Sequence, residues 1–141
     1  MKKILIVIIC CLLTISCVGL KSTSSHVPST ATLAPDKGGV EGFIRTPNPI
    51  DQRGLIVYLA TILHIGEDRG GFLDLANAPF AHVQDNGYFR IDNVPPGEYI
   101  LVVYEVVMGG KALQDDNGDF IVIQIQRGII RDLGVVNFNL E

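Results

Sequence analysis

The sequence predicts an all-β fold, a seven-stranded antiparallel β-sandwich, preceded by an export leader and a polar tether. Three observations predict it. Apolar runs rich in β-branched and aromatic residues recur between turn signals. The part of the chain after the tether has no helical apolar period, and only Phe72–Asn77 suggests a short helical turn. The stretch Gln84–Tyr104 is typical of two strands separated by chain breakers.

This central stretch carries the clearest signals. Asn86-Gly87 supplies the positive φ angles of a tight turn before the first of its strands. Pro95-Pro96-Gly97 then interrupts the chain, because proline has no N–H for a ladder. The same reading along the chain predicts seven strands, at Val40–Arg45, Leu55–His64, Ala81–Gln84, Tyr88–Ile91, Glu98–Val107, Asp119–Gln126 and Gly134–Leu140.

A family resemblance lies in the same residues. The turn at Asp85–Gly87, an aromatic-x-I strand and the sequence V-P-P-G-x-Y ending at Tyr99 resemble the carboxypeptidase regulatory-like domain. Val40–Ile44 resembles the opening V-x-G-x-I strand of that family. The resemblance spans about residues 38–140 and implies a transthyretin-like sandwich. It implies no activity, because the family is mostly an accessory module.

Residues 1–16 are predicted to be a lipoprotein signal peptide. Lys2 and Lys3 precede the apolar run Ile4–Ile15, which is shorter than the ~20 residues of a membrane-spanning helix. Ser16-Cys17 resembles a bacterial lipoprotein cleavage box, so Cys17 is predicted to carry the acyl chains that bind the membrane. The alternative is an ordinary secretory signal cut nearby, which would leave Cys17 as a free thiol or remove it.

Residues 17–37 are predicted to be a lipid-anchored, flexible tether, because Lys21–Lys37 is rich in Ser, Thr and Pro and has no aromatic residue. The expected location is extracytoplasmic, on the cell membrane or the outer membrane. Val18 resembles the residue found after the cysteine of lipoproteins sorted to an outer membrane. No cysteine follows Cys17, so the mature domain, residues 38–141, has neither a disulfide nor a thiolate metal site.

The charge of this domain excludes one class of partner. Residues 38–141 hold seven basic and fourteen acidic residues, a net charge of −7. An acidic domain repels phosphate backbones, so we expect no binding to nucleic acid.

The residue inventory also limits the chemistry. The domain has no serine, so Thr46 and Thr61 are its only Ser/Thr-type hydroxyls, and Ser-His-Asp or Cys-His acyl transfer is excluded. His64 and His82 lack a metal-ligand spacing. Asp115-x-Asn117-x-Asp119 has the oxygen spacing of a calcium loop, but a hairpin turn explains it better, because Phe120 replaces the loop's glycine. We therefore predict no cofactor, no metal and no catalytic residue.

One pattern suggests a partner. The strand at residues 99–104 hardly alternates between polar and apolar residues. The resemblance to the carboxypeptidase regulatory-like domain implies that Tyr99, Leu101 and Val103 face the core, which leaves Ile100, Val102 and Tyr104 as apolar side chains on the opposite face. Two interpretations remain open. The insertion Gly66–Pro79, with Phe72, Leu73 and Leu75, covers this face, or the face binds an envelope protein or a second copy of the chain.

Two functions of different classes follow. The first is a non-catalytic cell-envelope lipoprotein, a binding or structural module displayed on a flexible tether. The second is a small envelope enzyme whose Asp, Glu and His acid–base groups lie near the 66–79 insertion. Its candidates are Glu67, Asp68 and Asp74, and a deep pocket that gathers them with His64 and His82 would favour it.

Overall fold

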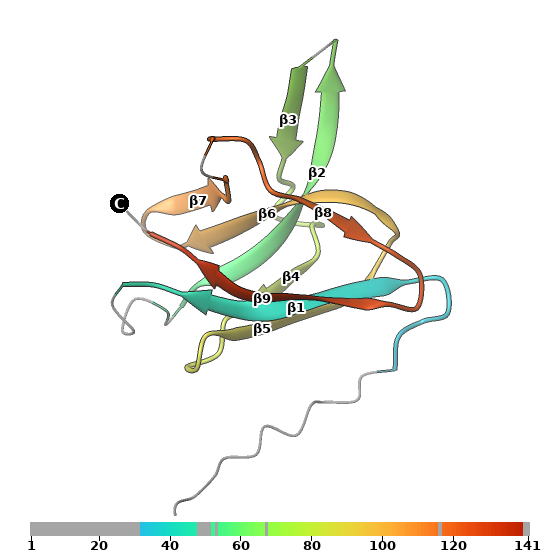
Figure 1. The fold of residues 1–141 in the computed structure, drawn as a ribbon, viewed down its shortest axis with the longest axis horizontal. Helices are drawn as coiled ribbons and strands as arrows, with labels where there is room; N and C mark the ends of the chain where they lie inside the picture. Colours follow the sequence, from blue (N-terminus) through green and yellow to red (C-terminus); the bar gives the residue numbers. More distant parts are fainter. Residues whose placement is uncertain (1–31, 48–51, 53, 67, 116, 140–141) are drawn as a thin grey trace, which may run out of the picture. The chain divides into compact units, whose positions relative to one another are not determined.

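The structure, a computed structural model, describes residues 32–47, 52, 54–66, 68–115 and 117–139 (Figure 1). The predicted signal peptide, Cys17 and most of the predicted tether lie outside the described residues. Residues 31–141 form one compact unit. In the described part of the chain, no helix has the length and apolar character needed to cross a membrane.

The fold is an all-β sandwich, as predicted, but the described residues form nine strands rather than seven. The strands are β1 (Gly38–Arg45), β2 (Ile56–Ile65), β3 (Asp68–Phe72), β4 (Phe80–His82), β5 (Tyr88–Val94), β6 (Gly97–Glu105), β7 (Gly109–Ala112), β8 (Val122–Ile125) and β9 (Ile130–Asn137). Sheet A has the order β5-β1-β9. Sheet B has the order β3-β2-β6-β7, with β4 also paired to β2 and β8 also paired to β6.

The prediction of a wholly antiparallel sandwich was wrong at one pair of strands. β1 pairs antiparallel with β5 but parallel with β9, where Gly39 is opposite Ile130 and Ile44 is opposite Val136. The predicted last strand also begins too far along the sequence, because the turn signals place its first residue at Gly134, whereas β9 begins at Ile130. Gly134 instead lies inside β9 with a φ of 63°, where the register with β1 shifts at a β-bulge.

The two additional strands, β3 and β7, belong to hairpins that the sequence signals missed. β3 pairs with the far end of β2, and β7 pairs with the end of β6. Their residues, DRGGF and GGKA, include four glycines and few β-formers. Pairing with a strongly β-forming neighbour, rather than local propensity, therefore specifies them.

The turn before β5 differs in detail from the prediction. Only Gly87 has a positive φ, 86°, while Asn86 accepts a hydrogen bond from the Tyr88 N–H through its side-chain oxygen (3.0 Å). The Gly87 N–H donates to the Gln84 carbonyl (2.8 Å). This is a type I-like turn closed by a left-handed glycine rather than a turn with two left-handed residues.

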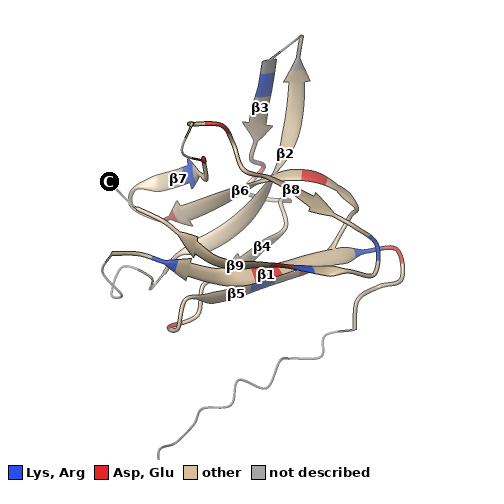
Figure 2. Ribbon diagram, viewed as in Figure 1, with Lys and Arg blue, Asp and Glu red and all other residues tan. Residues whose placement is uncertain are grey.

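The main core lies between the two sheets. Phe89 and Ile91 from sheet A meet residues of sheet B that include Leu59 and Leu101, and these four side chains are each at most 3% exposed. Tyr99 and Leu101 belong to this core, as the family resemblance implied. Acidic and basic residues are interspersed among the strands and loops (Figure 2).

Candidate ligand-binding cleft

The predicted partner surface of Ile100, Val102 and Tyr104 lies on the outer face of sheet B. Ile100 and Val102 are only 1% and 6% exposed, and Tyr104 is half-buried. Leu73 and Ala78, from the segment that follows β3, pack against this outer cluster. The structure thus has the insertion over this face, so Ile100 and Val102 are not open to a partner in this conformation.

Only part of the insertion forms this cover. Leu73 packs on the outer cluster, whereas Leu75 and Phe72 are 49% and 54% exposed and lie outside it. Phe72 lies outside the cover because it belongs to β3, a strand that the sequence signals do not predict. Phe72 ends β3 directly opposite Thr61, which places its side chain on the other face of sheet B.

A cleft lies at the end of the sandwich, beside the phenyl ring of Phe72. Its volume is about 720 Å³, within the usual range of small-molecule sites. We call it the Phe72 cleft. The described residues that line it are Thr61, Phe72, Asp74, Ala76, Asn77, Ala78, Pro79, Phe80, Ile91, Asp92, Asn93, Pro95 and Tyr99. Figure 1 shows the β2–β3 hairpin standing clear of the other strands, which leaves part of its surface uncovered.

A row of three side chains forms the floor of the cleft. Thr61 on β2 is opposite Tyr99 on β6 and opposite Phe72 on β3, so the three share one face of sheet B. Tyr99 is 9% exposed and belongs to the core, whereas Phe72 projects into solvent. The Tyr99 hydroxyl donates to the Pro95 carbonyl (2.9 Å), and burial raises the pKa of this phenol. The floor therefore runs from the core to an exposed aromatic ring.

Asp74 organises one wall of the cleft. Its carboxylate accepts hydrogen bonds from the Asn77 side-chain amide (2.8 Å) and the Ala76 N–H (3.0 Å). Its carbonyl accepts from the Ala78 N–H (2.7 Å). The Asn77 bond, followed by the Ala76 bond, holds the pKa of Asp74 below its ordinary value. Asp74 therefore stays ionised at neutral pH, and its hydrogen bonds stabilise a turn. A carboxylate in this state is poorly suited to act as a general acid.

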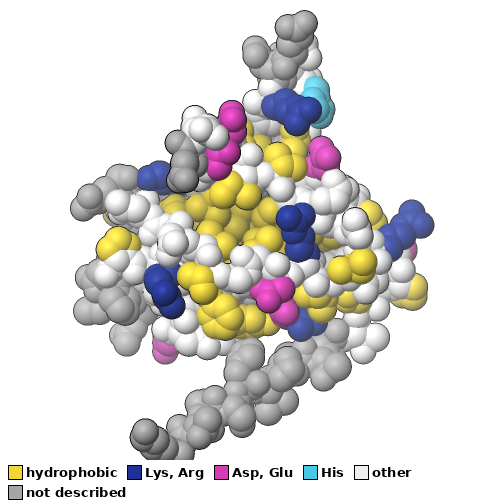
Figure 3. All heavy atoms as spheres, viewed as in Figure 1, with side chains coloured by type: hydrophobic (Ala, Val, Ile, Leu, Met, Phe, Trp, Pro, Cys, Tyr) yellow, Lys and Arg dark blue, Asp and Glu magenta, His cyan; other side chains and the backbone are white. Residues whose placement is uncertain are grey.

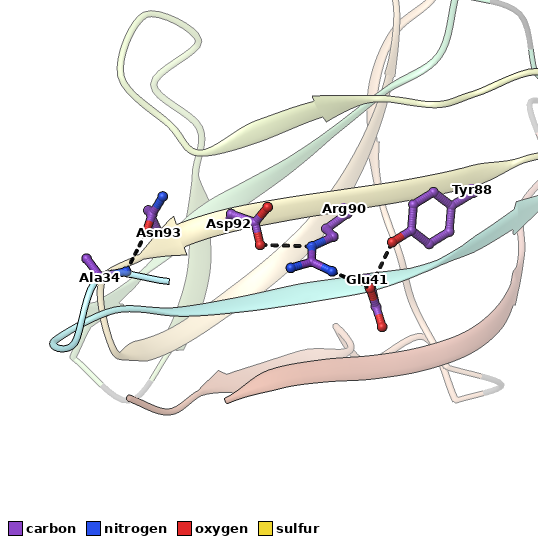
Figure 4. Close-up of polar contacts among 6 residues, drawn as sticks. All are labelled: Ala34, Glu41, Tyr88, Arg90, Asp92 and Asn93. Carbon is purple, nitrogen blue, oxygen red and sulfur yellow. Dashed lines mark hydrogen bonds and ion pairs between the residues drawn. The ribbon is translucent and has the colours of Figure 1, made fainter. Parts of the chain in front are cut away.

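The opposite wall is the end of β5. Figure 4 shows its side chains on the outer face of sheet A. The Arg90 Nε donates to Asp92 (2.9 Å), and the Arg90 Nη1 lies 3.4 Å from Glu41, which also accepts from the Tyr88 hydroxyl (2.8 Å). Burial, helped by the bond to Glu41, raises the pKa of Tyr88. The carboxylate of Asp92 is thus paired with a cation on the outer face of sheet A, while Asp92 itself borders the cleft.

Asn93 fixes the shape of that wall. It has a φ of 58°, the left-handed region that asparagine tolerates better than most residues. Its side-chain oxygen accepts from the Ala34 N–H (2.9 Å), which ties the segment before β1 to the end of β5 (Figure 4). The register between β1 and β5 also shifts here, so the wall is a β-bulge.

The histidines do not join this cleft. His82 on β4 is opposite Ile56, and its ring is 5.8 Å from that of Phe80. His64 lies eight residues farther along β2 than Ile56, about 26 Å at the usual rise of a strand. The two histidines are therefore too far apart to share a metal or act as an acid–base pair. Glu67 and the side chain of Asp68 lie outside the described part of the structure.

The possible calcium loop folds as a turn. Asp115 accepts hydrogen bonds from the N–H groups of Asn117 (2.9 Å) and Asp119 (3.0 Å) through one carboxylate oxygen. Its backbone N–H donates to the Asp119 carbonyl (2.8 Å). These bonds support the hairpin interpretation. Over the described residues, no group of three or more His, Cys, Asp or Glu side chains is placed to hold a metal ion.

A second, apolar cleft of about 400 Å³ opens between β9 and the segment before β8. Figure 3 shows apolar side chains gathered in the middle of this face of the domain. The lining includes Ile121, Leu133 and Val136, with Ile121 40% exposed. β9 forms the edge of sheet A, but Arg131 pairs with the inward-facing Val40, and a bulge interrupts the strand at residue 134. Inward charges and bulges oppose the addition of another strand.

Most residues of the Phe72 cleft were missed from the sequence. Asp74 was a candidate acid and Thr61 a candidate hydroxyl, but Phe80, Asp92 and Asn93 were not singled out. One local signal was available, because an Asp-Asn pair in a strand before Val94-Pro95 is typical of a bend or bulge. The position of Phe72 had no such signal, since it depends on the pairing of β3.

Comparison with known proteins identifies no family. No family model matches the chain, and no curated protein matches it. Two similar solved structures are the N-terminal and C-terminal interface mutants of a type II cohesin–X-dockerin complex from Acetivibrio cellulolyticus. Each has 18% identity and a TM-score of 0.38, and the match covers 70% of this chain. The chain spans about half of the matched chain's length (52%). What this protein binds is therefore inferred from its own residues.

Proposed function

We propose that the protein is a non-catalytic binding module of the cell envelope, a β-sandwich held at the membrane through lipidated Cys17. The observation that carries this proposal is the composition of the Phe72 cleft. The carboxylates of its two acidic lining residues, Asp74 and Asp92, are hydrogen-bonded by neighbouring groups, and the aromatic ring of Phe72 is exposed. Such a site is built for contact rather than proton transfer.

The placement at the membrane rests on the leader sequence. Lys2 and Lys3, the short apolar run and Ser16-Cys17 favour export followed by acylation at the cysteine. Each buried lipid CH₂ contributes about 0.8 kcal/mol, so several acyl chains on one residue anchor a protein firmly. The tether then separates the domain from an anionic bilayer, which its net charge of −7 also favours.

The resemblance to the carboxypeptidase regulatory-like domain agrees with this role. Its sequence features are a turn at Asp85–Gly87 and the V-P-P-G-x-Y segment, and the family is mostly an accessory module. We include membership of that family in the proposal. Membership accounts for a folded domain whose task is recognition, without supplying a substrate.

The anchor and the cleft are tested separately on the full-length protein. Intact mass of the purified protein is expected to show acyl chains at Cys17, and Cys17→Ala is expected to remove them and to release the protein from membranes. An unmodified amino end on the wild-type protein contradicts the anchor. Every envelope-binding assay uses the full-length Cys17→Ala protein, in which no acyl chain masks the contribution of the cleft. Sedimentation with isolated envelopes is expected to show binding that Phe72→Ala weakens, whereas unchanged binding contradicts the cleft as the site.

A further inference from the structure

The ring of Phe72 is exposed beside a polar site. Phe72 is 54% exposed, although apolar side chains of this size are usually buried. It shares one face of sheet B with Thr61 and Tyr99, whereas Phe80 is opposite Tyr58 and has its ring on the outer face. The half-exposed ring of Phe72 offers a flat surface to a ligand that has both apolar C–H faces and polar edges.

The polar groups of the cleft are mainly hydrogen-bond acceptors. Asp74 contributes carboxylate oxygens, Asn77 and Asn93 contribute amides, and Thr61 contributes a hydroxyl. The described lining contains neither lysine nor arginine, which disfavours an anionic ligand. A ligand rich in O–H donors matches this set.

The carboxylates do not call for a cationic ligand either. Asp92 forms an ion pair with Arg90 (2.9 Å), and Asp74 accepts hydrogen bonds from Asn77 and Ala76. The charge of Asp92 is therefore paired within the protein, and the charge of Asp74 is stabilised by uncharged donors, although its oxygens have further lone pairs with which to accept. An uncharged ligand that donates O–H groups suits these free acceptors.

The walls are poorly suited to an extended peptide. Peptide recognition at a sheet edge uses regular main-chain hydrogen bonds. Here the edge of β5 is interrupted by the bulge at Asn93, and Pro95 has no N–H. On the other wall Pro79 also lacks an N–H, and its carbonyl already accepts from the Leu59 N–H (2.9 Å). Side chains, rather than the backbone, must make most of the contacts.

From these observations we infer that the Phe72 cleft binds an uncharged, hydroxyl-rich saccharide segment of the envelope. This inference rests on the proposed function as a binding module. The ring of Phe72 packs against a sugar face, while Thr61 and the oxygens of Asp74 bond to its hydroxyl groups. A protein ligand is the competing outcome.

The direct test is calorimetric titration of the full-length protein with uncharged hexasaccharides of glucose, mannose, galactose, xylose and N-acetylglucosamine. The protein is held in a polyoxyethylene detergent, because alkyl glycosides would compete for the site. At least one hexasaccharide is expected to bind, with Phe72→Ala lowering the affinity roughly ten-fold. Thr61→Val, which keeps the β-branched shape, is expected to lower it roughly three- to ten-fold. The matched control Phe43→Ala, an exposed phenyl on sheet A, is expected to change it less than about two-fold.

Treated envelopes separate failure of the saccharide from failure of the binding module. Binding that depends on Phe72, survives protease and is lost after periodate oxidation supports the saccharide. Binding that depends on Phe72, survives periodate and is lost after protease overturns the saccharide but leaves the binding module. Binding that does not depend on Phe72 overturns both. If Phe72→Ala melts early, the Thr61→Val result decides, and no binding of any hexasaccharide rejects the inference.

Discussion

Replacing Leu73 by alanine removes the side chain that covers the outer cluster of sheet B. Leu73 is half-buried, packs against Ile100 and Val102, and lines the 270 Å³ groove that remains beside them. Truncation to alanine removes three carbon atoms, and a fully buried CH₂ contributes about 0.8 kcal/mol. For a half-buried leucine we expect the free energy of unfolding to fall by about 1–1.5 kcal/mol.

The same segment provides the matched control. Leu75 lies two residues farther along the chain, is 49% exposed and is outside the outer cluster, so Leu75→Ala is expected to change stability by less than about 0.5 kcal/mol. Equilibrium urea unfolding of the full-length protein, followed by tyrosine fluorescence, measures both values. Equal effects of the Leu73 and Leu75 variants, or a Leu73 variant as stable as wild type, would refute the role of Leu73 as the cover.

Three further predictions concern the core and the titrating groups. Phe89→Ala, at a side chain with no exposure, is expected to cost about 3–5 kcal/mol in the same unfolding assay, and a loss below about 1 kcal/mol would contradict the core assignment. Because the pKa of Asp74 is lowered in the fold, its contribution to stability is present above the unfolded pKa and is lost as the pH falls below about 4. Asp74→Asn should flatten that acid limb of the stability profile, and an unchanged limb would count against the turn. Because the pKa of Tyr88 is raised, its contribution is present below about pH 10 and is lost above it, so Tyr88→Phe should remove part of the late phenolate absorbance titration, to which Tyr99 also contributes. A titration identical to wild type would contradict the burial of Tyr88.

The strands that could be predicted from sequence are those with their own apolar pattern. β6 was predicted because Tyr99–Tyr104 is a continuous β-forming run, and the turn before β5 because Gly87 follows Asn86. β3 and β7 were missed because their glycine-rich sequences have little strand propensity of their own. They are edge strands, and a neighbour's backbone supplies their order.

The candidate site was harder to predict for the same reason. Thr61 and Phe72 are brought together by the register of β2 with β3, and Asp92 joins them from the other sheet. No spacing along the chain encodes a contact that depends on two pairings at once. The insertion illustrates the limit, because it was expected to act as one cover, yet Leu73 packs on sheet B and Phe72 points to the opposite face.

The parallel pairing of β1 with β9 has a consequence for the order in which the protein folds. β1 is made early, but both of its partners, β5 and β9, come from distant parts of the sequence, as the pairing of Gly39 with Ile130 shows. Closing such long loops costs conformational entropy before the free energy of native contacts can offset it. Non-local β topologies therefore fold slowly, in milliseconds to seconds. Sheet A therefore cannot be completed until the residues of β9 have been synthesised.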